Sequence, residues 1–299
     1  MTDEPPTPAD APLPDAPSAT SEYREANGVR LHVVAAGDPD DPLVVLLHGF
    51  PEFWYGWCEH VAPLVAAGYR VLVPDQRGYN LSAKPDGVGA YGIDALSGDV
   101  AGLVATEGRD SAHVVGHDWG GLVAWDVARR YPALVDRLAI LNAPHPTVFT
   151  RTIASNPRQL RKSWYLLFFQ LPWLPEWTAR RDDFALWVAA LEAARPGAFD
   201  TADLERYRTA WRRDGAPTAM VNWYRALLRA PSSPSRERVV TPTLILWGED
   251  DQALVPELAE TSRDYCAAGT LERFGDATHW LHHEHPERVT RRLRAHLDA

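Results

Sequence analysis

One short segment constrains the fold of this chain most: an apolar run that ends in glycine-flanked polar residues and leads directly into a helical pattern. Residues 112–115 form the apolar run, Gly-His-Asp-Trp-Gly follows at 116–120, and apolar residues then recur at helical spacing. This order predicts a strand, a tight turn and a helix. It is the layout of a nucleophile elbow, G-x-nucleophile-x-G, with Asp118 in the central position.

The residue type at position 118 indicates a particular chemistry. An aspartate is already ionised at neutral pH, and the N–H groups at a helix N-terminus favour the anion. Such a carboxylate can attack an sp³ carbon without first losing a proton, and the resulting ester can be hydrolysed at its carbonyl. The structural alternative is that Asp118 serves only as a helix N-cap.

Further apolar runs alternate with helical segments along the chain. An alternation of this kind predicts a mostly parallel sheet that is covered by helices on both faces. We expect residues 30–36 to form an edge strand. The predicted buried strands are residues 43–47, 70–74, 112–115, 138–141 and 243–247.

Residues 147–236 interrupt this alternation. They contain no convincing buried strand, but they hold six tryptophans and seven prolines among helical patterns. We therefore predict a helical cap, inserted so that it covers the carboxyl ends of the strands, where α/β sheets bind ligands. The core then comprises residues 22–146 and 237–299. The Pro-rich residues 1–21 are predicted to form a disordered or extended tail.

Composition excludes several classes of protein. The formal net charge of −10 argues against binding to nucleic acid or to an anionic membrane, since both need clustered Lys and Arg. Neither a signal peptide nor a run of 18 apolar residues is present. Cys58 and Cys266 are expected to be free thiols in a reducing cytoplasm. We expect a monomer or a homodimer.

Two further loops supply candidate groups. After residues 43–47 come His48-Gly49-Phe50-Pro51, where the Phe50 N–H could form an oxyanion hole together with the N–H of Trp119. His48 is expected to brace this loop, and Phe50-Pro51 is a candidate cis bond.

The second loop follows residues 243–247 and contains Glu249, Asp250 and Asp251. His279 lies further on, which gives the chain order nucleophile, acid, histidine. In this interpretation Asp251 orients His279, and a neutral His279 takes a proton from water. Glu249 and Asp250 compete with Asp251 for the role of the acid.

A histidine-rich tract near the C-terminus offers an alternative use for these residues. Such tracts can bind metal, but the spacing here matches no zinc signature and no cysteine lies nearby. We expect neither a metal nor a cofactor. The tract consists of His279, His282, His283 and His285.

Taken together, these motifs resemble those of the α/β-hydrolase-fold epoxide hydrolases, over residues 23–297. The matching stretches are HGFPE (48–52), DQRGY (75–79), GHDWGG (116–121), SWYLLFFQLPWLPE (163–176), NWYR (222–225) and the closing Gly-Glu-Asp-Asp…Thr-His-Trp.

The resemblance implies a function and two further site residues. It implies that Tyr165 and Tyr224 hold the oxygen of an epoxide while Asp118 attacks carbon, that Asp251 is the acid, and that a vicinal diol is formed, as in detoxification. The aromatic cap suggests a small hydrophobic epoxide, which we expect to contact Phe50, Trp119 and Phe168. The alternatives are a haloalkane dehalogenase and a non-catalytic ligand-binding protein on the same fold.

Overall fold

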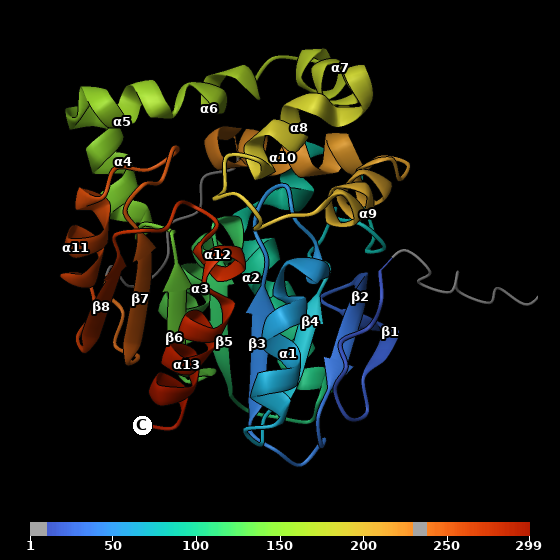
Figure 1. Ribbon diagram of the computed structural model, residues 1–299, viewed down its shortest axis with the longest axis vertical. Coiled ribbons are helices and arrows are strands. Elements are labelled where there is room, and N and C mark those ends of the chain that lie inside the picture. The colour runs from blue at the N-terminus through green and yellow to red at the C-terminus, as the bar shows by residue number, and fades with distance from the viewer. Residues whose placement is uncertain (1–10, 230–237) are drawn as a thin grey trace, which may run out of the picture.

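The computed structural model describes residues 11–229 and 238–299. Its centre is an eight-stranded sheet with the strand order β1-β2-β4-β3-β5-β6-β7-β8 (Figure 1). The strands are β1 (Thr20–Ala26), β2 (Val29–Ala36), β3 (Leu43–Leu47), β4 (Arg70–Pro74), β5 (Ala112–His117), β6 (Val135–Leu141), β7 (Thr243–Gly248) and β8 (Gly269–Phe274).

The five predicted buried strands are confirmed as β3 to β7. Every residue of β3, β4 and β7 is buried, as expected for parallel strands that are covered on both faces. β2 runs antiparallel to both of its neighbours, and the pairs from β4 to β8 are parallel. The fold is therefore an α/β-hydrolase fold with a mostly parallel sheet.

The edge of the sheet differs from the prediction. Residues 30–36 lie within β2, which is not an edge strand, because β1 pairs along its whole length in a hairpin. The turn of this hairpin is Asn27-Gly28, where both residues have positive φ, as a type I′ turn requires. β1 begins at Thr20, inside the stretch predicted as a tail, and residues 1–10 lie outside the described part of the chain.

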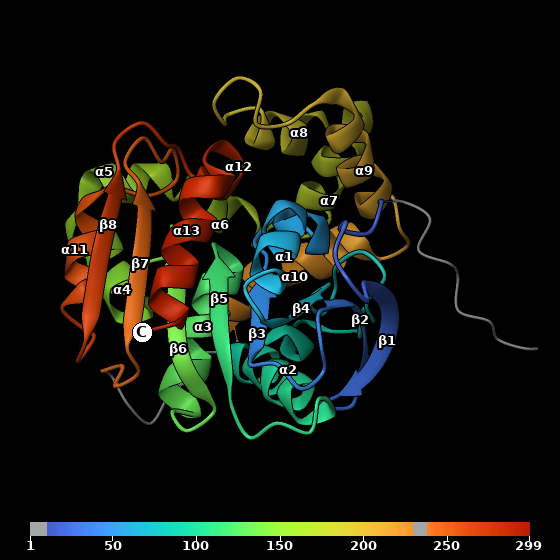
Figure 2. The same ribbon diagram turned by 60° about the horizontal axis from the view of Figure 1, so that its bottom comes forward.

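Helices cover both faces of the sheet. α1 (Cys58–Val65), which follows the 3₁₀ turn η1 (Trp54–Trp57), packs against α13 (Pro286–Leu297) on one face. α2 (Ile93–Thr106) and α3 (Trp119–Arg130) pack together on the other face (Figure 2). α11 (Glu257–Arg263) lies on β7 and β8, and α12 (Leu281–Glu284) precedes α13. The apolar side of α13 buries Val289, Leu293 and Leu297 at helical spacing.

Helices alone fill the described part of the chain between β6 and β7, apart from turns, and lie above one end of the sheet in Figure 1. They are α4 (Pro146–Ser155), α5 (Pro157–Lys162), α6 (Trp164–Phe168), α7 (Leu174–Arg180), the 3₁₀ turn η3 (Arg181–Phe184), α8 (Ala185–Leu191), α9 (Thr201–Trp211) and α10 (Ala216–Arg229). None of the helices in the described residues is long and apolar enough to cross a membrane.

Indole N–H groups tie this helical segment to the loops of the sheet. Trp211 of α9 donates a hydrogen bond to the carbonyl oxygen of Pro51, and Trp223 of α10 donates one to the carbonyl oxygen of Arg77. Both bonds are buried, so the low local dielectric favours them. The aromatic residues of the cap therefore set its position over the strand ends.

Candidate active site

The predicted nucleophile lies at a strained turn. Asp118 follows β5 and has φ 50° and ψ −118°, a conformation that residues with a Cβ rarely adopt. Gly116 and Gly120 make the turn possible, because a Cβ on either would collide with backbone carbonyl groups. The side chain of Asp118 makes no capping hydrogen bond to α3. The N-cap alternative is therefore excluded, and the carboxylate faces the space under the cap.

Two groups approach the carboxylate of Asp118. The backbone N–H of Phe50 donates to Oδ1 at 2.8 Å, and Nε2 of His279 lies 3.6 Å from Oδ2. The bond between Phe50 and Pro51 is cis. Among the described residues, no hydrogen bond joins the Trp119 N–H to this carboxylate, so its place in the oxyanion hole stays a prediction.

The structure brings His279 and Asp251 together. Nδ1 of His279 lies 2.6 Å from Oδ2 of Asp251, while the N–H groups of Ala253 and Leu254 donate to Oδ1. Asn142, which follows β6, donates to Oδ2 at 2.6 Å and accepts from the Gly248 N–H. Motif analysis missed Asn142; its only sequence signal is a polar residue directly after a buried strand.

The other two candidate acids have different partners. Glu249 pairs with Arg273 at 3.0 Å. Asp250 pairs with Arg195 at the surface, where both side chains are about half exposed. Neither carboxylate contacts His279, so the geometry favours Asp251 as the acid.

The two carboxylates determine the charge of His279. Burial alone would lower its pKa, but Asp251 and Asp118 outweigh burial and raise the pKa of His279 to about 10. Burial alone would also raise the pKa of Asp251, yet the charge of His279 and the hydrogen bonds around it keep that pKa low. His279 is therefore protonated in the free protein at neutral pH, in contrast to the neutral form expected from the sequence.

Tyr165 of α6 and Tyr224 of α10 line the same cavity as Asp118 and Trp119. Their ring centroids are 5.9 Å apart, and the Tyr224 ring packs edge-on against Trp119 at 5.0 Å. Burial, followed by the charge of Asp118, raises the pKa of both phenols. Both hydroxyl groups therefore keep their protons at neutral pH and are available as donors.

The cavity has a volume of about 390 Å³, including space open to solvent. Apolar side chains form most of its wall, which suits a hydrophobic ligand. The residues beyond those already named are Leu122, Asn142, Ala143, Pro144, Phe149, Leu166, Leu227 and Leu254.

Phe168 does not lie where the sequence analysis expected it. It is absent from the described cavity wall, and its ring packs against Trp164 and Phe169. Phe169, four residues after Tyr165, is buried against Tyr224 and Phe50. Residues four apart share a helix face, so Phe169 occupies the inner side and Phe168 does not. Phe50 contacts this aromatic cluster but is not part of the cavity wall.

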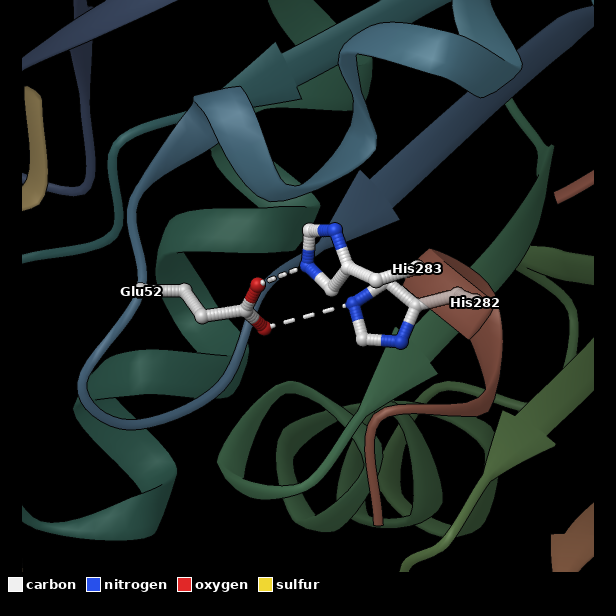
Figure 3. Close-up of side chains that lie close together, drawn as sticks. All are labelled: Glu52, His282 and His283. Carbon is white, nitrogen blue, oxygen red and sulfur yellow. Dashed lines mark hydrogen bonds and ion pairs between the residues drawn. The ribbon is translucent and has the colours of Figure 1, made fainter. Parts of the chain in front are cut away.

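A buried cluster that includes Glu52, His282 and His283 (Figure 3) reaches His279 through His117, whose ring centroid lies 4.7 Å from that of His279. Oε1 of Glu52 accepts hydrogen bonds from His283 Nε2 at 2.7 Å and from the Tyr207 hydroxyl at 3.2 Å. Oε2 lies 3.0 Å from His117 Nδ1, and His117 Nε2 lies 2.9 Å from the carbonyl oxygen of His279. Both ring nitrogens of His117 therefore face oxygen atoms, one of the Glu52 carboxylate and one of the His279 carbonyl group.

Glu52, His282 and His283 also present three donor atoms within 4.8 Å of one another. This donor set would suit zinc or a similar ion. However, Tyr207, His117 and His283 already surround the Glu52 carboxylate at hydrogen-bond distance, and His282 Nε2 lies 3.4 Å from Oε2, so protein groups already occupy the positions that an ion would take. This network was not anticipated, since its members come from distant parts of the chain.

Removal of metal should therefore leave the protein unchanged. Dialysis against EDTA is expected to preserve full activity and thermal stability, because no step and no buried charge depends on an ion. Elemental analysis of the purified protein provides the matching measurement. A stoichiometric metal whose removal abolishes activity would contradict this prediction.

An aspartate at the strand–helix turn after β5, with an Asp–His pair beside it beneath a layer of helices, agrees with the α/β-hydrolase class. The family model described as the alpha/beta hydrolase fold matches residues 42–286. The AB hydrolase superfamily protein YfhM of Bacillus subtilis is 44% identical, covering 92% of this chain and 97% of that protein. Epoxide hydrolase 4 of Homo sapiens is 37% identical, covering 89% and 75% respectively.

Solved structures agree with these sequence matches. The Bacillus megaterium epoxide hydrolase in complex with an inhibitor superposes with a TM-score of 0.84 at 30% identity, covering 93% of this chain and all of that one. This chain is a hydrolase and belongs to the epoxide hydrolase family of the α/β-hydrolase fold.

Proposed function

We propose that this enzyme adds water to a small hydrophobic epoxide through a covalent ester on Asp118. The observation that carries the proposal is the shared cavity, where an ionised carboxylate faces two phenols that remain protonated. A nucleophile and a pair of donors are the groups that opening an oxirane requires. The relatives named epoxide hydrolases point to the same substrate class.

In the first step an oxygen of Asp118 forms a bond to one ring carbon, and that carbon's bond to the epoxide oxygen breaks. Tyr165 and Tyr224 donate hydrogen bonds to the oxygen as negative charge develops, and one of them transfers its proton. Groups positioned where charge appears in the transition state provide a large share of catalysis. The product is a hydroxyalkyl ester of Asp118.

The second step depends on the change in charge that the first step causes. The ester is neutral, so His279 loses one of the two carboxylates that keep its pKa high. It can then give up its proton, which restores the tyrosine, and act as a base while Asp251 holds it. Water attacks the ester carbonyl, the Phe50 and Trp119 N–H groups stabilise the oxyanion, and the diol leaves.

A haloalkane substrate fits these groups less well. A halide leaves as an anion and needs donors but no proton, whereas this cavity offers two phenols that can protonate an alkoxide. Phe50, directly after His48-Gly49, has no side-chain N–H to offer a halide. The non-catalytic alternative would not need the His279–Asp251 pair at all.

Replacement of His279 should separate the two steps. His279→Gln is expected to accumulate the ester, because alkylation of Asp118 needs no base whereas hydrolysis does. Intact-protein mass spectrometry after incubation with an aryl epoxide should show one adduct, and peptide mapping should locate it on Asp118. The control is His285→Gln, a half-buried histidine outside the cavity wall, which should turn over without an adduct. A folded, inactive H279Q protein that forms no adduct would contradict the two-step scheme.

The charge of His279 also predicts how stability depends on pH. Its folded-state pKa of about 10 lies above its ordinary value of 6.5, so the stabilisation is complete below pH 6.5 and is lost as pH rises towards 10. The difference in the free energy of unfolding between wild type and H279Q should therefore shrink over that range. Urea denaturation at pH 6, 8 and 10 measures it, and a constant difference would argue against a charged His279.

A further inference from the structure

The outer surface of the cap carries apolar side chains where a water-exposed helix surface would normally be polar. We call residues 157–181, which comprise α5, α6, α7 and the start of η3, the cap strip. The strip lies along the upper edge of the molecule in Figure 1, on the side away from the sheet. Its exposed apolar side chains are between 43% and 69% exposed, and they are Leu160, Trp164, Leu167, Leu171, Trp173 and Trp177.

The spacing of these side chains places them on one face. Leu160, Trp164, Leu167 and Leu171 follow one another at intervals of four, three and four residues, which is the period of a helical stripe. Trp173 and Trp177 repeat at an interval of four across the start of α7. Leu171 and Trp173 lie in the turn between α6 and α7. The six exposed side chains fall within residues 160–177 and are therefore not isolated surface residues.

The side chains on the inner face of the same helices already contact the rest of the protein. Tyr165 and Leu166 line the cavity, and Phe169 is buried under the strip. α6 is thus apolar on both sides, although only one side contacts the rest of the protein. A helix that is apolar all round normally has an apolar environment on both sides.

The charges of the strip differ from those of the whole chain. It contains five cations, and its single acid, Glu176, is buried in a pair with Arg225. Arg158 and Arg181 have the acidic partners Glu257 and Asp182. Lys162 donates hydrogen bonds to the carbonyl oxygens of Asp251 and Gln252. Arg161 and Arg180 remain, and no ion pair with a described residue is present for either. The strip is therefore basic on a chain whose net charge is −10.

We propose that the cap strip binds the surface of an anionic lipid bilayer, with α5, α6 and α7 lying in the plane of the interface. Tryptophan and leucine side chains enter the boundary between headgroups and acyl chains, and arginine side chains contact the anionic headgroups. This combination is the recognised chemistry of interfacial helices. The charge-based expectation of no membrane binding used the net charge of the whole chain, which does not describe this strip.

The charge of the strip disfavours a second copy of this chain as the occupant. A twofold contact places the same patch on both partners, so the cations of one strip would meet those of the other. The repulsion between these like charges would oppose dimerisation through the strip, and salt screens it only partly. In an anionic bilayer the exposed apolar side chains would contact the acyl chains, and the cations of the strip would contact negatively charged headgroups.

Vesicle flotation of the full-length protein tests the proposal. The probes are vesicles of phosphatidylcholine alone and vesicles with about one third phosphatidylglycerol. Binding to the anionic vesicles is expected, and it should weaken at high salt. Trp164→Ser with Leu167→Ser should reduce it at least about tenfold, since both apolar side chains are exposed and contribute little to folding.

A charge-matched pair of variants isolates the electrostatic part. Arg161→Gln with Arg180→Gln should weaken binding to anionic vesicles roughly thirty-fold, at about fivefold for each charge removed near the surface. Arg291→Gln with Arg294→Gln makes the same charge change on α13, at the far end of the molecule, and should have no effect. Diol formation from a water-soluble epoxide should be unchanged in all variants, which confirms their folding.

Three outcomes would overturn the proposal. The first is the absence of flotation with either vesicle, and the second is equal binding by the wild type and the strip variants. The third is a dimer in solution that W164S/L167S dissociates, without vesicle binding, which would assign the strip to a second copy. Light scattering at the same protein concentration distinguishes that case.

Discussion

Asp118→Ala is expected to abolish diol formation, with a loss of roughly 10⁴-fold or more, as for other covalent nucleophiles. The variant should also form no ester with any epoxide, because the attacking oxygen is absent. Steady-state turnover of an aryl epoxide and intact mass measure both effects. Asp250→Ala, which removes a surface carboxylate next to the Asp251 position, is the matched control and should stay active. Substantial activity in Asp118→Ala would refute the mechanism.

Replacement of both cap tyrosines should have the second-largest effect. Each lost donor to a developing oxyanion costs on the order of 10²-fold, so Tyr165→Phe with Tyr224→Phe should lose about 10⁴-fold in turnover, and each single change much less. The reason is that either phenol alone can still supply the proton. Stopped-flow measurement of the alkylation step should locate the loss in ring opening.

The control for the tyrosine pair is Tyr23→Phe, which removes a hydroxyl group on β1, far from the cavity. It should leave turnover unchanged. A double variant that keeps most of its activity would show that some other group donates to the epoxide oxygen. A loss in the hydrolysis step with normal alkylation would give the phenols a different role.

Much of the sheet follows from local sequence. The run Leu43–Leu47 is apolar throughout, and it forms a strand over the same residues because both of its faces are covered. β1 and β8 were not predicted from the sequence, because neither is apolar throughout. Edge strands have one exposed face, so their composition is mixed and their apolar signal is weak. In β1 the Asn27-Gly28 turn was the available signal.

Some residues of the candidate site could likewise be predicted from local sequence, and others could not. Asp118 could be predicted from its motif, because glycines on both sides of a strained residue leave a local signature. The choice among Glu249, Asp250 and Asp251 could not be made from local pattern, since it depends on which side chain turns towards His279. Phe168 lies outside the described cavity wall, because the direction in which the side chains of a short helix point depends on tertiary packing.

The network around Glu52 was beyond prediction from a single sequence. Its members are separated by as many as 231 residues in the chain, and the histidine-rich tract that contains His282 and His283 does not indicate Glu52, His117 or Tyr207 as partners. Only the fold brings α12, the loop before η1 and the cap helix α9 together. Tyr207, in particular, would be assigned to ordinary aromatic packing.

The proposed catalytic residues are divided between the sheet and the cap, and this division determines which step of the proposed reaction a movement of the cap would affect. Asp118, Asp251 and His279 are fixed to strand ends, whereas Tyr165 and Tyr224 belong to helices of an insertion. Under the proposed mechanism, lifting the insertion would stop ring opening while Asp118, Asp251 and His279 stay in place. Under the same proposal, substitutions in the inserted helices would change substrate preference without moving the residues that hydrolyse the ester.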